Sequence, residues 1–371
     1  MTQTPERHFN ILIIGQGLAG SLLAWKLIKQ GLQVMVIDNH HHNSSSQVAA
    51  GIINPITGHR VNLTEGFEKF MPVAKQTYNE LRETFNQEFL TAIKQQRLIK
   101  NLGQQNYYEK RLQQSEYQSF IANKSVSSTK ENTNNLFRFT EFGIGNIQET
   151  YRVNVSILLE TLQIWLIEKN AFINKQINYS DLSINTDSIN LKTNNIHITA
   201  EQIVFCEGYQ AIHNPWLKNL PFKLAKGETL TVELEQSCPD MLNWGHWLIP
   251  KHHKNTAFLG SSYAWNDISS TPSTDIADKL LNSMTKFTCL TGKIINHQAG
   301  VRPSTINRQP LIGVHPDHSR LYCFNGFGSK GCLLIPYYAD KLTQHFSDKL
   351  PLHTVLPNID TALVLNSEQA Q

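Results

Sequence analysis

The sequence predicts an α/β fold in which a domain with a parallel sheet is interleaved with an α+β domain built on an antiparallel sheet. Three observations predict it. The 371 residues are 40% hydrophobic, which is enough for sizeable cores in about two domains. Residues 9–37 have the pattern of a strand, a glycine-rich turn, a helix and a second strand. Residues 222–260 alternate apolar and polar side chains between turns, as antiparallel strands do.

The apolar pattern predicts the remaining elements in chain order. Helical spacing predicts helices over 18–30, 66–85, 104–122, 155–169, 275–287 and 331–346. Short apolar runs predict strands at 9–14, 34–37, 98–101, 173–179, 203–206, 247–249, 257–259, 294–301, 311–314 and 321–324. Partial alternation predicts a hairpin over 184–198, and the Ser, Thr and Asn content of 123–135 predicts a loop.

These elements predict that both domains are discontinuous. The opening strand–helix–strand unit, the central helix and its strands, and the closing strand–glycine–helix segment share one α/β character. We therefore predict one domain from residues 1–61, 151–215 and 293–371. The segments between them, 62–150 and 216–292, have the character of insertions, and the second is antiparallel β. They are predicted to form the other domain.

Composition and charge exclude several classes of protein. Charged residues make up 17% of the chain and the net charge is +3, too small an excess to predict nucleic-acid binding. The five cysteines include no Cys-x-x-Cys pair, so we expect neither a disulfide framework nor a metal site. The polar N-terminus and the lack of a long apolar run predict a cytoplasmic protein without a membrane span. We interpret the run His40-His41-His42 as a solvated loop.

The first motif is Gly15-Gln16-Gly17-Leu18-Ala19-Gly20, a G-x-G-x-x-G pattern. It follows a predicted strand, opens a predicted helix and precedes Asp38 by 23 residues counted from Gly15, which is typical of a Rossmann-like domain. Gly15 allows the tight turn, Gly17 lets the backbone approach a pyrophosphate, and Gly20 allows close helix–strand packing. The helix N-terminus favours phosphate, and Asp38 favours a ribose. Both NAD and FAD fit this pattern.

Two further segments decide between these dinucleotides. After Asp38 the chain carries Ser44–Ser46 and then Ala49-Ala50-Gly51-Ile52, small residues that allow close approach to an extended cofactor. Near the other end it carries Gly300-Val301-Arg302-Pro303, and then residues 321–336, which have the pattern of a strand, a glycine turn and a helix. The second helix N-terminus suits an electron-rich group.

With these motifs in this order, the chain resembles the FAD-dependent D-amino-acid oxidase superfamily. That family includes glycine oxidase, sarcosine oxidase, D-amino-acid dehydrogenase and the flavin domain of the bifunctional tRNA wobble-uridine enzyme. The resemblance covers the FAD-binding segments, about half of the chain. It implies a Rossmann-like FAD-binding domain with a substrate domain on an antiparallel sheet.

The resemblance implies FAD-binding residues in each motif. Asp38 stands where a Glu is commoner, with Asn39 beside it. Ile177, in the strand expected at 173–179, would bind the adenine through its backbone. The implied FAD-binding residues are Gly15, Gly17, Leu18, Ala19, Gly20, Asp38, Asn39, Ser45, Ser46, Ala50, Gly51, Ile52, Ile177, Gly208, Gly328, Ser329, Lys330 and Gly331.

The resemblance also implies a substrate site. Arg302 matches the arginine of a Gly-x-Arg-Pro motif that clamps the substrate carboxylate, because a guanidinium binds a carboxylate with two parallel hydrogen bonds. A structural ion pair is the alternative role for Arg302. Arg60 and His59 follow the flavin-side loop and are further candidates for the substrate pocket, with an exposed loop as the alternative for His59.

The family comparison also shows departures. Sarcosine-oxidase-type members attach their flavin through a Cys near this motif, and no Cys lies around Arg302, so we expect FAD to be bound non-covalently. Those enzymes also carry a lysine that helps oxygen react, where a rough alignment places Phe258 here. The resemblance therefore leaves both an oxidase and a dehydrogenase open.

The expected activity is oxidation of the C–N bond of an amino acid or another carboxylate-bearing amine, by hydride transfer to flavin N5. The cofactor carries the difficult step, so no general base and no other catalytic residue is named. Two alternatives stay open. One is a flavin oxidase that acts on a modified tRNA wobble uridine, with tRNA as partner. The other is a low-turnover FAD-binding subunit of a larger complex. The sequence leaves the oligomeric state open.

Overall fold

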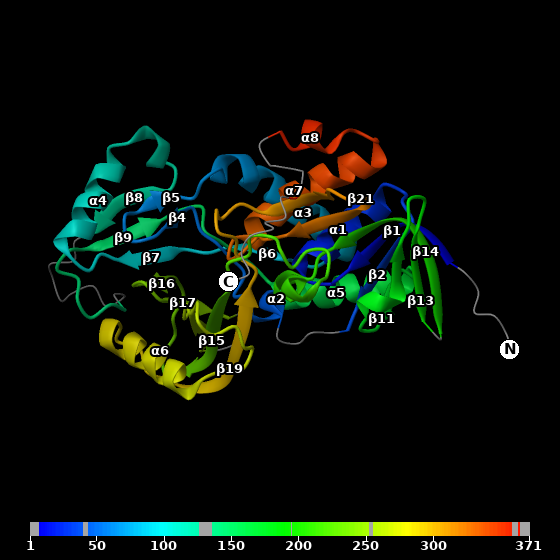
Figure 1. Ribbon diagram of the computed structural model, residues 1–371. Helices are drawn as coiled ribbons and strands as arrows, with labels where there is room; N and C mark the ends of the chain where they lie inside the picture. Colours follow the sequence, from blue (N-terminus) through cyan, green and yellow to red (C-terminus); the bar gives the residue numbers. More distant parts are fainter. Residues whose placement is uncertain are drawn as a thin grey trace. The chain divides into compact units, whose positions relative to one another are not determined.

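The computed structural model describes residues 7–39, 44–125, 136–193, 195–251, 255–357 and 363 (Figure 1). The chain folds into two units. Unit 1 comprises Met1–Gln47, Val155–Ala225 and Val301–Gln371, and unit 2 comprises Val48–Asn154 and Lys226–Gly300. The predicted histidine loop at 40–42 and most of the predicted 123–135 loop lie outside the described residues.

Unit 1 combines a largely parallel sheet with helices. Its elements are β1 (Arg7–Ile14), α1 (Leu18–Lys29), β2 (Val34–Asp38), α2 (Ser45–Val48), α5 (Val155–Glu168), β11 (Phe172–Asn174), η2 (Tyr179–Asp181), β12 (Leu182–Ile184), β13 (Ile189–Thr193), β14 (Ile196–Phe205), η3 (Gly208–His213), β20 (Leu311–His315), β21 (His318–Asn325), α7 (Gly331–Ser347) and α8 (Leu352–Val355), where η marks a 3-10 helix.

The sheet of unit 1 brings its glycine turns to one edge. Strands β11, β2, β1, β14 and β21 are neighbours in that order and all run parallel. Because the carboxyl ends of parallel strands meet at one edge, the turns that follow β1, β14 and β21 converge there. Both faces of the sheet are buried, which explains why its strands are continuous apolar runs rather than alternating ones.

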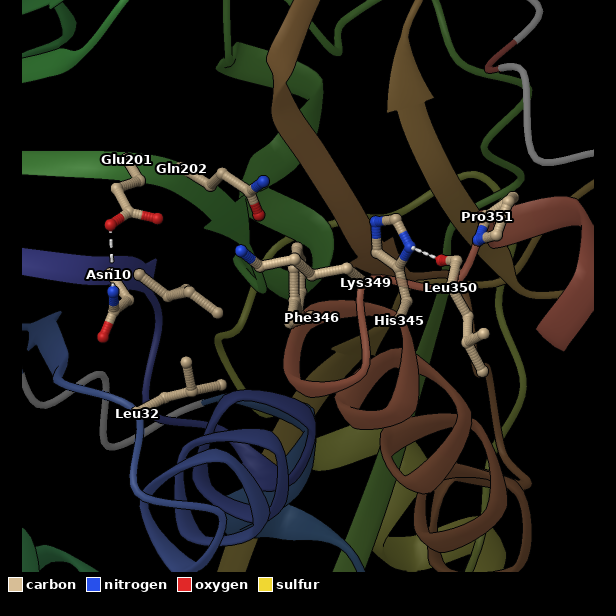
Figure 2. Close-up of a pocket in the computed structure, with 10 residues that line it drawn as sticks. Asn10, Leu32, Glu201, Gln202, His345, Phe346, Lys349, Leu350 and Pro351 are labelled. Atoms are coloured by element: carbon tan, nitrogen blue, oxygen red, sulfur yellow. Dashed lines mark hydrogen bonds between the residues drawn. The ribbon is translucent and has the colours of Figure 1, made fainter.

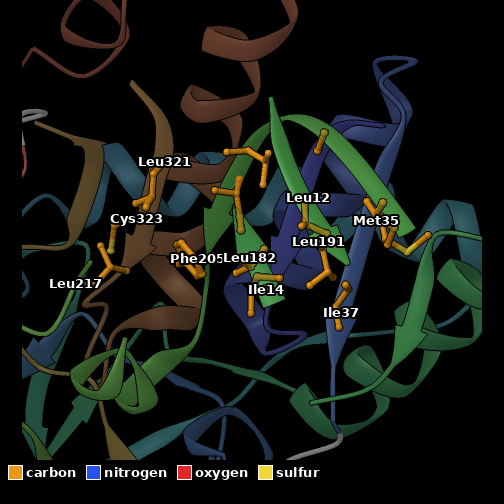
Figure 3. Packing of buried hydrophobic residues seen from close by; sticks show 14 of the residues in the cluster. Leu12, Ile14, Met35, Ile37, Leu182, Leu191, Phe205, Leu217, Leu321 and Cys323 are labelled. Carbon is orange, nitrogen blue, oxygen red and sulfur yellow. The ribbon is translucent and has the colours of Figure 1, made fainter. Parts of the chain in front are cut away.

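Alternate residues of these strands pack into one apolar cluster, shown in Figure 3. It contains Leu12 and Ile14 of β1, Met35 and Ile37 of β2, and Phe205 of β14. The hairpin strands β12 and β13 and the segment after η3 complete it with Leu182, Leu191 and Leu217. The intervening residues of the strands point to the opposite face, where α1 packs with α5 and α7.

Unit 2 is built on a mainly antiparallel sheet. Its elements are β3 (Ile52–Ile53), β4 (Ile56–Thr57), β5 (Asn62–Leu63), α3 (Phe67–Phe85), β6 (Leu90–Ala92), β7 (Gln95–Leu98), α4 (Leu102–Leu112), η1 (Ser115–Tyr117), β8 (Ile121–Ser125), β9 (Ile144–Ile147), β10 (Tyr151–Val153), β15 (Ala225–Leu234), β16 (Met241–Asn243), β17 (Trp247–Pro250), β18 (Thr256–Gly260), α6 (Thr274–Phe287) and β19 (Gly292–Arg302).

The long sheet of unit 2 has the order β19-β15-β18-β17-β16-β7-β9-β8. Its core lies against α6, whose Ala277, Leu280 and Met284 pack in one cluster with Val232 and Leu259 of the sheet. A separate small sheet has the order β3-β10-β6. The predicted fold class, a Rossmann-like α/β part interleaved with an α+β part on an antiparallel sheet, is confirmed. Among the described residues, no helix combines the length and apolarity needed to cross a bilayer.

Three predicted elements are wrong in part. The helix predicted over 104–122 ends at Leu112, because residues from Ile121 onward pair with β9 as strand β8. The strand predicted at 98–101 is β7, which ends at Leu98. The strand predicted at 173–179 ends at Asn174, because its partner β2 ends at Asp38 directly opposite. Ile177 therefore lies in a loop and not in a strand.

Candidate functional site

The first glycine turn has no room for a side chain at Gly15 or at Gly20. Gly15 has φ +105°, and a Cβ atom on it would lie 2.5 Å from the Cys206 carbonyl oxygen. A Cβ on Gly20 would lie 1.9 Å from the Gly15 carbonyl oxygen. Larger residues would separate α1 from β1 or β1 from β14, so these glycines bring a bare backbone turn to the sheet edge.

The N-terminus of α1 is open to an anion. Its cap residue Gly17 offers no side-chain hydrogen bond, and the first turn holds no acidic residue. Ser46 of α2 lies over this turn, since the Leu18 N–H donates to Ser46 Oγ at 3.1 Å. The structure therefore brings Ser46 and the first glycine motif together, next to N–H groups that favour negative charge.

Asp38 ends β2 beside the same turn. Its Oδ2 accepts a hydrogen bond from the Gln16 N–H at 2.7 Å. The next residue, Asn39, donates from Nδ2 to Gln176 Oε1 at 3.3 Å. Both side chains lie at the edge formed by the carboxyl ends of the parallel strands, where the sequence predicts a ribose site.

Two more turns lie at this edge. Gly208, with φ +58°, follows β14, and its carbonyl oxygen accepts a hydrogen bond from Asn325 Nδ2 at the end of β21 (2.8 Å). Gly331 opens α7, and a Cβ on it would lie 3.9 Å from Leu18 Cδ2, so α7 begins beside the start of α1. As in α1, the cap residue of α7 makes no side-chain hydrogen bond and the first turn has no acidic residue; this cap residue, Lys330, is exposed.

Arg302 lies next to the last of these turns. It ends β19, whose last two residues, Val301 and Arg302, belong to unit 1. Arg302 is half-buried, and Val301 forms an isolated parallel bridge with Ser44. The next residue, Pro303, accepts a hydrogen bond from the Gly328 N–H at 3.2 Å. Unit 1 therefore brings together the Ser44–Ser46 segment, Arg302 and the Gly328 turn.

Five of the predicted site residues belong to unit 2, namely Ala50, Gly51, Ile52, His59 and Arg60. Ala50 is buried and precedes Gly51, whose φ is +76° and whose Cβ would lie 1.9 Å from the Val153 carbonyl oxygen. Ile52 pairs with Arg152 across β3 and β10. Residues 50–52 thus form a fixed backbone segment against β10.

His59 and Arg60 are exposed in the turn between β4 and β5. Arg97 stabilises this turn, because its Nη2 donates a hydrogen bond to the Gly58 carbonyl oxygen. The His59 ring packs edge-on against Tyr107. The structure gives neither His59 nor Arg60 a buried setting.

Sequence reasoning missed three charged residues. Arg152 stands between Tyr151 and Val153, Lys251 follows the apolar run 247–250, and neither belongs to a motif. Glu207 is the middle residue of the Cys206-Glu207-Gly208 turn. Although the residue keeps some exposure, its carboxyl accepts hydrogen bonds from Tyr179 Oη and Asn214 Nδ2, both at 2.8 Å. Burial raises the pKa of Glu207 to about 7.

A cavity of about 300 Å³ opens elsewhere in unit 1 (Figure 2). It is lined by Asn10 and Ile11 of β1 and by His345, Phe346 and Lys349 at the end of α7. Figure 2 shows the His345 ring bonded to the Leu350 carbonyl oxygen. The glycine turns follow the carboxyl end of β1 and precede the start of α7, whereas this cavity is lined by the middle of β1 and the end of α7.

Comparison with known proteins decides the class. A family model described as FAD dependent oxidoreductase matches residues 10–345. The chain belongs to this FAD dependent oxidoreductase family. The predicted membership of the D-amino-acid oxidase superfamily is thereby confirmed, and FAD is its cofactor.

Individual relatives are distant. The chain is 22% identical over 378 residues to the tRNA 5-methylaminomethyl-2-thiouridine biosynthesis bifunctional protein MnmC of Psychrobacter cryohalolentis, covering 90% of this chain. It spans 52% of that curated relative, about half its length. Glycine oxidase from Bacillus cereus has a TM-score of 0.79 at 18% identity, covering 97% of this chain and all of that one. Iminodiacetate oxidase from Chelativorans has a TM-score of 0.75 at 17% identity, covering 93% and 98%.

The residues of unit 1 fit a dinucleotide. The cap residues of two neighbouring helices, Gly17 of α1 and Lys330 of α7, make no side-chain hydrogen bond to their helices. Gly15 before α1 and Gly20 in its first turn have no room for a Cβ. A dianionic pyrophosphate satisfies free N–H groups of this kind and gains from both helix dipoles. The chain is therefore an FAD-dependent oxidoreductase with this edge as the candidate site.

Proposed function

We propose that the chain oxidises the C–N bond of an amino acid or related carboxylate-bearing amine, with non-covalent FAD. The observation that carries the proposal is the position of Arg302, whose following residue packs on the Gly328 turn at the candidate FAD edge. The similarity in fold to glycine oxidase and iminodiacetate oxidase supports an amine substrate. We also propose that unit 1 binds FAD and that unit 2 supplies most of the substrate pocket.

In this mechanism the chain's residues bind and orient. Bound FAD supplies the hydride acceptor. The α1 N-terminus and Ser46 hold the pyrophosphate, Asp38 holds the ribose, and the open N-terminus of α7 favours negative charge on the flavin side. The Arg302 guanidinium donates two hydrogen bonds to the substrate carboxylate, which fixes the reacting carbon in place. Orientation alone can account for much of the rate, so the proposal needs no protein base.

The test is Arg302→Leu, assayed with an amino acid that reduces the wild-type flavin. Loss of a charge-assisted bidentate contact should raise KM by roughly tenfold or more, while the flavin absorbance of the purified protein stays unchanged. Arg308→Leu is the matched control, because Arg308 is an exposed arginine six residues further on. Equal KM values in both variants would refute the carboxylate role of Arg302.

The similarity to MnmC favours a second candidate, oxidation of an amine attached to a tRNA base. The chain covers only half of that bifunctional relative, so the match supports the flavin chemistry more than the RNA substrate. Reduction of the flavin by tRNA that carries an aminomethyl-type wobble uridine, with no reduction by free amino acids, would favour this candidate.

A further inference from the structure

Unit 2 contains a buried arginine whose charge has no partner among the described residues. Arg152 on β10 is 8% exposed. Its Nη1 donates to the Pro250 carbonyl oxygen at 3.4 Å, while Nε is buried without a hydrogen-bond partner. Its guanidinium lies 5.1 Å from the centre of the Phe258 ring.

A second cation shares the same ring. Lys251 Nζ lies 4.4 Å from the centre of the Phe258 ring. Burial lowers the pKa of Lys251, and the positive charge of Arg152 lowers this pKa further. Burial also lowers the pKa of Arg152. A phenylalanine ring attracts each cation but neutralises neither, so the buried charge of Arg152 and the partly desolvated charge of Lys251 remain at one ring without a counter-charge.

Another buried cation of unit 2 shows the usual arrangement. Lys226 is 2% exposed, and its Nζ lies 2.6 Å from Asp267 Oδ2 and 3.5 Å from Glu228 Oε1. Buried charges in proteins are normally paired in this way, because an unpaired buried charge is costly. For Arg152 and Lys251, the described part of the chain supplies no carboxylate.

The two cations lie next to the segment assigned to the flavin side. Arg152 pairs with Ile52 across β10 and β3. Phe258 and Ile52 both pack against the small buried cluster that contains Ala50. Residues 50–52 are the part of unit 2 that the family resemblance assigns to the flavin side, so the two cations lie beside the segment of unit 2 that is expected to take part in the reaction.

We propose that Arg152 and Lys251 form an anion-binding site, centred on Phe258, that takes a carboxylate of the substrate. The inference rests on the proposed function, since it assumes a carboxylate-bearing amine. It adds two specificity-determining residues to Arg302. A carboxylate supplies the missing counter-charge and gives the free Arg152 Nε–H an acceptor.

The test is binding of malonate to the FAD-containing protein by isothermal titration calorimetry, with neutral malonamide as the comparison ligand. Wild type should bind malonate and not malonamide. Arg152→Met and Lys251→Met should each weaken malonate binding by about tenfold or more, as loss of a charge-assisted contact does. Lys286→Met is the matched control, because Lys286 is an exposed lysine over the ring of Phe287 at 5.5 Å.

Equal malonate affinity in the Arg152, Lys251 and Lys286 variants would overturn the inference, as would equal affinity for malonamide. Flavin absorbance and circular dichroism of each variant establish that it is folded, and half-buried Lys251 can be removed with less disturbance than Arg152. The Arg302→Leu variant separates this inference from the proposed function. Loss of malonate binding in that variant alone supports the Arg302 role and overturns the Arg152–Lys251 site.

Discussion

At the residue scale, the backbone of Glu207 lies directly beside the first glycine turn. Its Cα would lie 3.4 Å from a Cβ on Gly15. Its hydrogen bonds to Tyr179 and Asn214 join η2 and the end of η3 to β14. The other titratable groups that interact with it are the Cys206 and Cys323 thiols, and no cation is among them. This explains why burial dominates and raises its pKa.

The raised pKa of Glu207 makes stability depend on pH. The group has an ordinary value of 4.5 and a folded-state pKa of about 7, so the native state holds the proton more tightly than the unfolded state. Its stabilising contribution is complete below about pH 4.5 and is lost as pH rises through about 7. Glu207→Gln removes the ionisation. The variant should therefore lose up to about 3 kcal/mol less of its free energy of unfolding over this pH range than the wild type does.

Urea unfolding of the two proteins at about pH 5 and about pH 8 measures the difference. Glu201→Gln is the control, because Glu201 is an exposed carboxylate on β14, the strand that the Glu207 turn follows. If wild type and Glu207→Gln lost the same free energy of unfolding over this range, the carboxyl would not titrate as described.

The roles of individual residues could be predicted only where a sequence motif indicated them. The spacing from the first glycine motif to the end of the next strand pointed to Asp38, and the family resemblance that the order of the motifs carries implied the role of Arg302. Arg152, Lys251 and Glu207 lie far apart in sequence, and their significance depends on which side chains surround them. No local pattern contains that information.

At the element scale, the start of α1 is defined by the space available to its glycines. Gly20→Ala would place a Cβ 1.9 Å from the Gly15 carbonyl oxygen, against backbone that cannot move without displacing β1 or β14. We expect this variant to be purified without flavin, or to fail to fold, since α1 must shift away from the sheet.

Gly103→Ala is the matched control for this clash. Gly103 lies in α4, and the nearest atom to its Cβ position is Asn101 Oδ1 at an ordinary 3.4 Å. This variant should keep both its flavin and its stability. The ratio of flavin absorbance to protein absorbance after purification measures the outcome, and full flavin content in Gly20→Ala would show that the turn does not limit cofactor binding.

Helices and strands could be predicted where both faces of a strand or one face of a helix are apolar, as in β1, β2 and α1. The predicted ends were wrong where the pairing of a strand with its neighbour decides where an element stops. Strand β11 stops because β2 stops, and β8 forms because β9 lies beside it. Ile177 lost its predicted strand setting for this reason, and its predicted role toward the adenine stays a prediction.

At the scale of the whole molecule, the chain passes repeatedly between its two units. Each unit gathers segments that are distant in sequence, with changes at Gln47, Asn154, Ala225 and Gly300. The alternation of α/β and antiparallel patterns predicts such an interleaved organisation. The assignment of FAD to unit 1 and of substrate to unit 2 remains a proposal, because the same fold supports many reactions.

The most direct test of the central claim is anaerobic reduction of the bound flavin. The purified protein is mixed without oxygen with a panel of amino acids and secondary amines, and the flavin absorbance is followed. The matched comparison compounds are 2-hydroxy acids, which keep the carboxylate and lack the amine. We predict that at least one amino acid or amine bleaches the flavin and that its 2-hydroxy counterpart does not. Bleaching by the hydroxy acids alone, or a bound flavin that no amine reduces, would contradict the account.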